Sequence, residues 1–362
     1  MPEHHSPKLL DPPDYSAEEQ QAVIDFVLAL RKSHIQAFLK QVELRMSGTK
    51  EDLRERLHEA LDGGDLTYER LVDFLDSLAP WGKQHVFLYQ GPRSDVQEWR
   101  DPDHALRLLK QHRLGKLFNA TLPLILPGKL TLSSITHADG KLRVTAVEKR
   151  EYTERTPQHD EEKETESGER ITLKAYIHHL TRTLAAFEWD LNANVAMLQI
   201  TQLQEEGDYE KLAEQFCELV KPWLDIKQFS PVDLRPVIRS LHEIEKNGQP
   251  EARSHGIDYR SPRGRRVSAR SPTPRDSVFG GEGFIDEAMD SVRKNGIGHL
   301  GNFYWLSRFK PGTAVNPLAG DVHVIIVGAN SRVNFPTPNT EEAVRYVLHR
   351  VRALSSTAPG PR

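Results

Sequence analysis

The chain has 362 residues, 28% of them charged, and a formal net charge of −4, so any surface that binds nucleic acid must be local. Its length allows about two or three domains. A single cysteine, Cys217, excludes an intramolecular disulfide and cysteine-rich zinc sites. No apolar run approaches the roughly 20 residues of a membrane-spanning helix, and residues 1–15 hold no apolar signal-peptide core. These features predict a cytosolic protein that makes no use of a membrane.

The first predicted unit is all-helical and covers residues 16–80, behind a disordered lead-in at 1–15. Ser16 followed by Glu19 forms a capping box, which marks the start of a helix. Two glycines at 63–64 break the chain before the last helix of the unit.

Within this unit, residues 35–57 are predicted to form two short helices joined by a tight turn. Gly48 supplies the backbone freedom of a sharp turn. Thr49, with Asp52 three residues later, forms a capping box in which Asp replaces the usual Glu or Gln. The apolar residues at the i, i+3, i+4, i+7 spacing of one buried helix face are Ile35, Phe38, Leu39 and Val42.

Basic residues gather around this turn. Lys50 lies at the start of the second helix, where backbone N–H groups and the helix dipole favour an anion such as phosphate. Arg54 lies on or near a face of the second helix that its leucines do not occupy, and Lys40, Arg45 and Arg31 lie close enough in sequence to extend a basic surface. Of these residues, Lys40, Arg45, Lys50 and Arg54 are the candidates for contacts with phosphate.

The turn and its leucines resemble the SAP domain, a helix–loop–helix module of many chromatin, DNA-repair and RNA-processing proteins. The residues in register with the family's pattern are Leu44, Ser47, Gly48, Thr49, Lys50, Leu53, Arg56 and Leu57. Glu43 departs from the pattern, because the family has glycine before this leucine. The resemblance covers residues 31–62 and no more of the chain.

The resemblance implies binding of double-stranded DNA, and in some members of RNA, through the loop and the start of the second helix. The residues it places there are Lys40, Arg45, Ser47, Gly48, Thr49, Lys50 and Arg54. One small module offers few phosphate contacts, and each adds about 0.9 to the slope of log affinity against log salt. We therefore expect weak, salt-sensitive binding. The alternative is an ordinary helical hairpin that packs against the rest of the protein.

Residues 85–246 are predicted to form an α+β body with an antiparallel sheet. The Asp139–Gly140 pair between two β-rich runs indicates a hairpin. An acidic exposed loop at 160–169 precedes a long strand predicted at 171–187. The Ser230–Pro231 pair indicates the start of a helix.

Residues 247–277 lose all periodicity and are predicted to be a basic flexible linker before a small C-terminal α+β unit at 278–355. Ser and Pro separate the arginines, so no stable helix or strand is expected. Flexible arginine-rich segments bind nucleic-acid phosphates and can become ordered on binding. The candidates for a second nucleic-acid contact are Arg263, Arg265, Arg266 and Arg270. The alternative is a loop that only improves solubility.

The chain contains neither a G-x-S-x-G elbow nor an H-E-x-x-H motif, so we expect no enzyme, no catalytic residue, no metal site and no cofactor. The sequence predicts an α+β protein that acts as an adaptor, binding DNA through the module and the linker and holding a protein partner on its body. Such a protein would be cytoplasmic and nucleoid-associated in a bacterium, or nuclear in a eukaryote. The alternative is a protein-interaction scaffold whose helical unit docks onto a partner and does not bind DNA.

Overall fold

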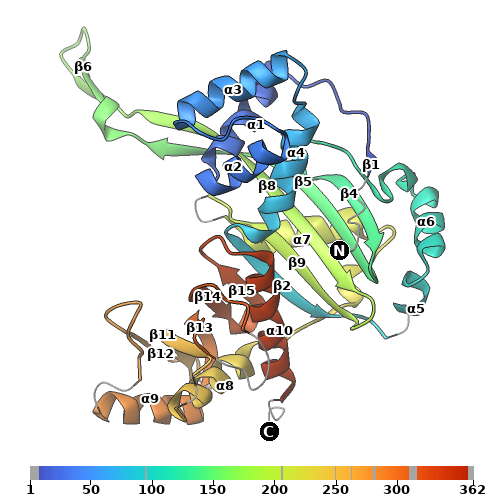
Figure 1. Cartoon of the computed structure of the whole chain (residues 1–362). Coiled ribbons are helices and arrows are strands. Elements are labelled where there is room, and N and C mark those ends of the chain that lie inside the picture. The colour runs from blue at the N-terminus through green and yellow to red at the C-terminus, as the bar shows by residue number, and fades with distance from the viewer. Residues whose placement is uncertain are drawn as a thin grey trace.

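The computed structural model describes residues 8–93, 96–204, 207–248, 250–261, 263–279, 283–309 and 316–357. One twisted sheet of 13 strands runs through the molecule, and helices pack on it along its length (Figure 1). The predicted α+β class is confirmed. No helix in these ranges is long and apolar enough to cross a membrane.

Four helices form the N-terminal part and pack around a separate core, to which Ile125 and Leu126 also contribute. They are α1 (Ala17–Ala29), α2 (Lys32–Gln41), α3 (Lys50–Asp62) and α4 (Tyr68–Leu78). The capping boxes predicted at Ser16 and Thr49 are both present. Helix α4 is tied to the sheet by a largely buried ion pair between Asp76 and Arg182, and the guanidinium of Arg182 also donates to the carbonyl of Leu124.

The lead-in belongs to the fold from residue 8 onward, while residues 1–7 lie outside the described ranges. Strand β1 (Lys8–Leu9) pairs in parallel with β3 (Ala120–Thr121). The Tyr15 hydroxyl donates to the Pro123 carbonyl at 2.6 Å. The prediction of disorder is therefore wrong for residues 8–15, because their polar groups find partners that are remote in sequence.

The strand order in the sheet is β1–β3–β4–β5–β8–β9–β2–β15–β14–β13–β11–β12, with β10 added to β2. Apart from β1 and β3, these strands are β2 (Gln84–Gln90), β4 (Thr131–Ala138), β5 (Lys141–Arg155), β8 (Tyr176–Asp190), β9 (Val195–Thr201), β10 (Ser230–Pro231), β11 (Ala252–Arg260), β12 (Arg266–Arg270), β13 (Ile297–Trp305), β14 (Val322–Val327) and β15 (Arg332–Phe335). Because β2 pairs with β15, the predicted body and the predicted C-terminal unit share one continuous sheet.

Two apolar cores lie on opposite faces of this sheet. Successive side chains of a strand point to opposite faces, and on β2 Phe87 enters one core while Val86 and Leu88 enter the other. The first core is completed by α5 (Val96–Trp99), α6 (Pro102–Gln111) and α7 (Tyr209–Val220). The second is completed by α8 (Arg235–Lys246), α9 (Gly283–Asn295) and α10 (Glu341–Thr357).

The hairpin of β4 and β5 is confirmed. Asp139 and Gly140 both have positive φ, 52° and 70°, as a two-residue hairpin turn requires. Strands β5 and β8 are each 15 residues long and pair along their full length.

Two predicted element starts are wrong. Ser230–Pro231 is a short strand on β2, and helix α8 begins only at Arg235. A Ser-Pro pair is compatible with a helix start and also with an edge strand. Here its pairing with β2 makes it a strand. The strand expected from residue 171 begins at Tyr176, whereas Arg170–Leu173 forms β7 in a separate two-stranded sheet with β6 (Glu161–Glu164).

Candidate nucleic-acid interface

The loop between α2 and α3 begins at the C-terminus of α2, where Glu43 adopts a left-handed conformation with φ 59°. The Leu44 N–H donates to the Leu39 carbonyl at 2.7 Å, and the Glu43 N–H donates to the Lys40 carbonyl at 3.2 Å. These two bonds make a Schellman motif, whose left-handed position favours glycine. Glu43, the position at which the chain departs from the SAP pattern, is thus a residue that glycine would replace without strain.

The start of α3 is set by a second pair of local contacts. The Thr49 side chain accepts from the Asp52 N–H at 3.2 Å, and the Asp52 carboxylate accepts from the Thr49 N–H at 2.7 Å. These bonds to Thr49 hold the pKa of Asp52 below its usual range. Gly48 has φ 137°, and a Cβ there would lie 2.8 Å from the Asp52 Cβ, so only glycine fits the turn.

Three side chains from the flanking helices brace the loop by donating to its carbonyls. Arg56 donates to the carbonyl of Arg45 at 2.6 Å and to that of Ser47 at 3.1 Å. Lys32 donates to the Gly48 carbonyl at 2.8 Å, and Gln36 donates to the Met46 carbonyl at 3.3 Å. The loop therefore has a defined conformation, and Arg56 and Lys32 are occupied in maintaining it. Sequence reasoning missed this role, because nothing in the local pattern shows which cations turn inward.

The predicted contact residues of the module differ in how freely they can reach a ligand. Lys40, Arg45 and Lys50 are exposed. The Arg45 guanidinium donates to the Ser47 hydroxyl at 2.9 Å, on the outside of the loop. Arg54 is half-buried, and its guanidinium lies 2.6 Å from the Asp25 carboxylate on α1. Its charge is thus compensated within the helical unit, which leaves three cations around the loop for a partner.

The electrostatic balance of the module is nearly even. Residues 31–62 contain seven Lys and Arg against six Asp and Glu. Glu43 and Glu51 are exposed beside the cations of the loop. An anion would therefore be attracted to the loop and the first turn of α3, where N–H groups point outward, rather than to a broadly basic face.

The arginine-rich segment is a β-hairpin and not the flexible linker predicted over 247–277. Strand β11 pairs with β12 from Gly256–Arg270 to Arg260–Arg266. The turn between them is closed by the Ser261 N–H donating to the Arg265 carbonyl at 2.8 Å. The alternation of apolar and polar residues that is typical of strands is missing from both strands of this hairpin. Strand β12 lacks it because it is an exposed edge strand, and β11 lacks it because it buries polar residues.

The four arginines predicted to bind phosphate lie at different places on this hairpin. Arg263 and Arg265 are exposed in the turn. The Arg266 guanidinium lies 2.5 Å from the buried Asp258 carboxylate. Arg270 donates to His255 at 3.2 Å and lines a cavity of about 690 Å³. Three further arginines line the same cavity, namely Arg253, Arg275 and Arg308.

The two predicted contact points are not brought together. Helix α3 and the β11–β12 hairpin lie at opposite ends of the molecule, separated by the sheet (Figure 1). Each must therefore be considered as a separate surface, and a short duplex held at the α2–α3 loop would not reach the hairpin.

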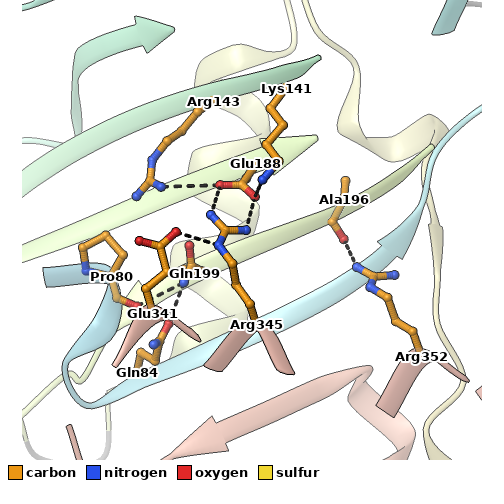
Figure 2. Close-up of polar contacts among 10 residues, drawn as sticks. All are labelled: Pro80, Gln84, Lys141, Arg143, Glu188, Ala196, Gln199, Glu341, Arg345 and Arg352. Atoms are coloured by element: carbon orange, nitrogen blue, oxygen red, sulfur yellow. Dashed lines mark hydrogen bonds and ion pairs between the residues drawn. The ribbon is translucent and has the colours of Figure 1, made fainter. Parts of the chain in front are cut away.

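A further charged site, which sequence reasoning missed, lies between α10 and the sheet. Figure 2 shows Lys141, Arg143 and Arg345 converging on Glu188, whose carboxylate accepts from Arg345 at 2.6 and 3.0 Å. Burial alone would raise the pKa of Glu188, but the hydrogen bonds and charge of Arg345 hold it below its usual range. The cluster thus fastens α10 to strands β5 and β8.

Arg352 extends this attachment along α10. Its guanidinium donates to the carbonyl of Ala196 at 2.5 Å (Figure 2) and to that of Tyr89 at 3.0 Å. Burial lowers the pKa of Arg352 to about 10. A cavity of about 270 Å³ lies among these residues. The guanidinium groups of Arg345 and Arg352 are bonded to the sheet, so they hold α10 against it.

Within the described ranges, no group of three or more His, Cys, Asp or Glu side chains is placed to hold a metal ion. Burial raises the pKa of the Cys217 thiol to about 11, which keeps it protonated and unreactive near neutral pH. The chain matches no protein-family model and no curated protein.

Proposed function

We propose that the protein binds double-stranded nucleic acid through the α2–α3 loop and the first turn of α3. One observation carries the proposal: the loop is braced by Arg56, Lys32 and Gln36, while Arg45 and Lys50 are left exposed at the start of a helix. A loop held in one conformation loses little entropy on binding. Phosphate oxygens suit the outward N–H groups of a helix start and the adjacent lysine.

The proposed binding is weak and depends on salt. Few cations surround the loop, and each neutralised phosphate adds about 0.9 to the slope of log affinity against log salt. The exposed Arg263 and Arg265 of the β11–β12 hairpin form a second, remote contact in this proposal. The protein then acts as a non-enzymatic adaptor on DNA, in the bacterial nucleoid or the eukaryotic nucleus, with its body free for a protein partner.

The test is fluorescence anisotropy with a labelled duplex at low salt. Lys50→Glu and Arg45→Glu should each weaken binding about tenfold and lower the salt slope by about one. Lys116→Glu is the matched control, because Lys116 is exposed in the short turn Gly115–Leu117 that packs beside α6, and α6 lies apart from α3 (Figure 1), so the variant should bind like the wild type. Equal affinity in all four proteins would overturn the assignment.

Arg54→Gln separates this site from the sequence-based prediction. Since Arg54 pairs with Asp25, its loss should lower the stability of the helical unit more than the affinity for duplex. A loss of affinity as large as that of Lys50→Glu, with unchanged thermal stability, would show that Arg54 contacts the ligand directly.

The second candidate function is a protein-interaction scaffold that does not bind DNA. The nearly even charge of residues 31–62 favours it, because a dedicated nucleic-acid surface usually carries a clear excess of cations. If the protein has this function, it does not bind duplex even at low salt, and a partner protein co-purifies stably with it.

A further inference from the structure

Strands β5 and β8 extend beyond their neighbours in the sheet as a projecting arm. Strand β4 pairs with β5 only as far as Val147, and β9 pairs with β8 only from Ala185 onward. The rest of the two strands continues as a two-stranded ribbon, capped by the small sheet of β6 and β7 at its tip (Figure 1). We call residues 149–182 the arm.

A two-stranded ribbon is marginally stable by itself in water, and local contacts hold this one together. Arg155 pairs with Asp160, which also accepts from the Ala175 N–H at 2.9 Å. Tyr152 stacks on His179 across the two strands, with ring centroids 4.8 Å apart. The arm is therefore built as an element of the fold, and its exposed side chains have a fixed place.

The tip of the arm is acidic and apolar. Residues 160–169 contain six Asp and Glu against one Lys. Nine large apolar side chains are exposed in the part of the chain that the structure describes, and four of them lie on the arm. They are Ile171, Leu173, Tyr176 and Ile177. Apolar side chains gathered beside a charged rim are typical of a protein-binding surface.

The hairpin at the other end of the sheet has the opposite charge. Residues 259–277 contain six Arg against one Asp. Apolar side chains are exposed here too. They are Val267 on β12, Phe284 on α9, and Ile297 on β13, which pairs with Arg260 of β11. Strand β12 ends the sheet, and in the described ranges its outer edge has no strand partner. Such an edge can accept another strand.

We propose that the acidic tip of the arm docks on the basic β11–β12 hairpin of a second copy of this chain. The two surfaces are opposite in charge, each exposes apolar side chains, and each offers a strand edge that has no partner strand in the described ranges. Figure 1 shows the arm and the hairpin projecting from different parts of the molecule, so one copy does not bring its own two surfaces together. In a dimer with a two-fold axis, the arm of each copy would contact the hairpin of the other, so that both surfaces of both copies are covered.

The contact between copies does not depend on nucleic-acid binding at the α2–α3 loop. It engages the hairpin arginines that the proposed function assigns to a second phosphate contact. Self-association and that second contact are therefore alternatives at the hairpin, with the carboxylates of the arm taking the place of phosphates.

A charge-swap experiment without nucleic acid tests the contact. The arm variant carries Glu162→Lys, Glu164→Lys and Glu166→Lys, and the hairpin variant carries Arg260→Glu, Arg263→Glu and Arg265→Glu. All six side chains are exposed, so their replacement leaves the cores intact. Mass in solution is measured by light scattering after gel filtration, and by sedimentation.

The wild type should form dimers or larger assemblies at low salt and dissociate at high salt, where exposed charges are screened. Each variant alone should associate at least about tenfold more weakly, since like charges then face each other. An equimolar mixture should associate again, because each arm then meets a hairpin of opposite charge. A monomeric wild type at low salt, or a mixture that stays monomeric, would overturn the proposal.

Lys50→Glu keeps the two proposals distinguishable. It should associate like the wild type, because Lys50 lies on α3, remote from the hairpin. If association fails while duplex binding still depends on Lys50, only the contact between copies is refuted. If association persists while duplex binding is absent, only the proposed function is refuted.

Discussion

The α2–α3 loop and the β11–β12 hairpin both present exposed cations, but they are built in different ways. The loop is held by contacts between residues close in sequence, such as Thr49 with Asp52 and Arg56 with Ser47. The hairpin is held by pairing with β13 and by burial of His255 and Asp258 within the sheet. A cation in a local motif can be recognised along the chain, whereas the conformation of an edge strand depends on its neighbours.

The largest expected effect concerns the attachment of the helical unit to the sheet. Arg182→Met removes one partner of the largely buried pair with Asp76 and leaves an uncompensated carboxylate, so stability should fall by about 3 kcal/mol. Urea unfolding measures the loss. Unfolding of α1–α4 should then separate from that of the hairpin, and a single unchanged transition would show that the two regions are not independent.

Two glycines give a matched comparison of the loop with the hairpin. Gly48→Ala introduces both an unfavourable φ and a 2.8 Å contact with Asp52, which should lower stability by about 2 kcal/mol. Gly264→Ala in the hairpin has a φ of 80° and open space around it, so about 1 kcal/mol is expected. Thermal unfolding of the two variants checks the order. A larger loss for Gly264→Ala would contradict the view that the loop is the more tightly constrained.

Glu43→Gly should act in the opposite direction. The left-handed φ of Glu43 costs free energy that glycine avoids, so the variant should gain up to about 1 kcal/mol of stability. It also removes a carboxylate beside the loop, and affinity for duplex should therefore rise. Glu55→Gly is a suitable control, because it lies in the interior of α3 and should lose about 1 kcal/mol instead.

Mild acid should distinguish the two regions by a smaller effect. Burial lowers the pKa of His255, so the folded hairpin disfavours protonation, and stability there falls as pH drops below the unfolded pKa of about 6.5. The pKa of Asp52 is also lowered in the folded state, but it affects stability at lower pH. The stabilisation from this carboxylate is fully present above the unfolded pKa of about 3.9 and is lost as pH falls through the folded pKa. The protection of backbone amides against hydrogen exchange should therefore fall near pH 5.5 in β11–β12 before it falls in α3.

The elements that sequence reasoning recovered are those with strong local signals. The capping boxes at Ser16 and Thr49 and the Asp139–Gly140 turn are all present. Each depends on contacts within a few residues, so the amino-acid pattern specifies it directly. The errors fall where pairing is remote: residue 8 pairs with residue 120, Ser230 pairs with β2, and β11 pairs with β13 from residue 252 opposite residue 305.

The candidate interface shows the same division. The sequence by itself determined the turn around Gly48 and the cations Lys40, Arg45 and Lys50 near it, because helix caps and sharp turns are local. Only the tertiary structure decided that Arg54 pairs with Asp25 and that the arm and the basic hairpin project as separate surfaces. The physical reason is that charge partners and sheet neighbours are set by the packing of segments distant along the chain, which short-range patterns do not encode.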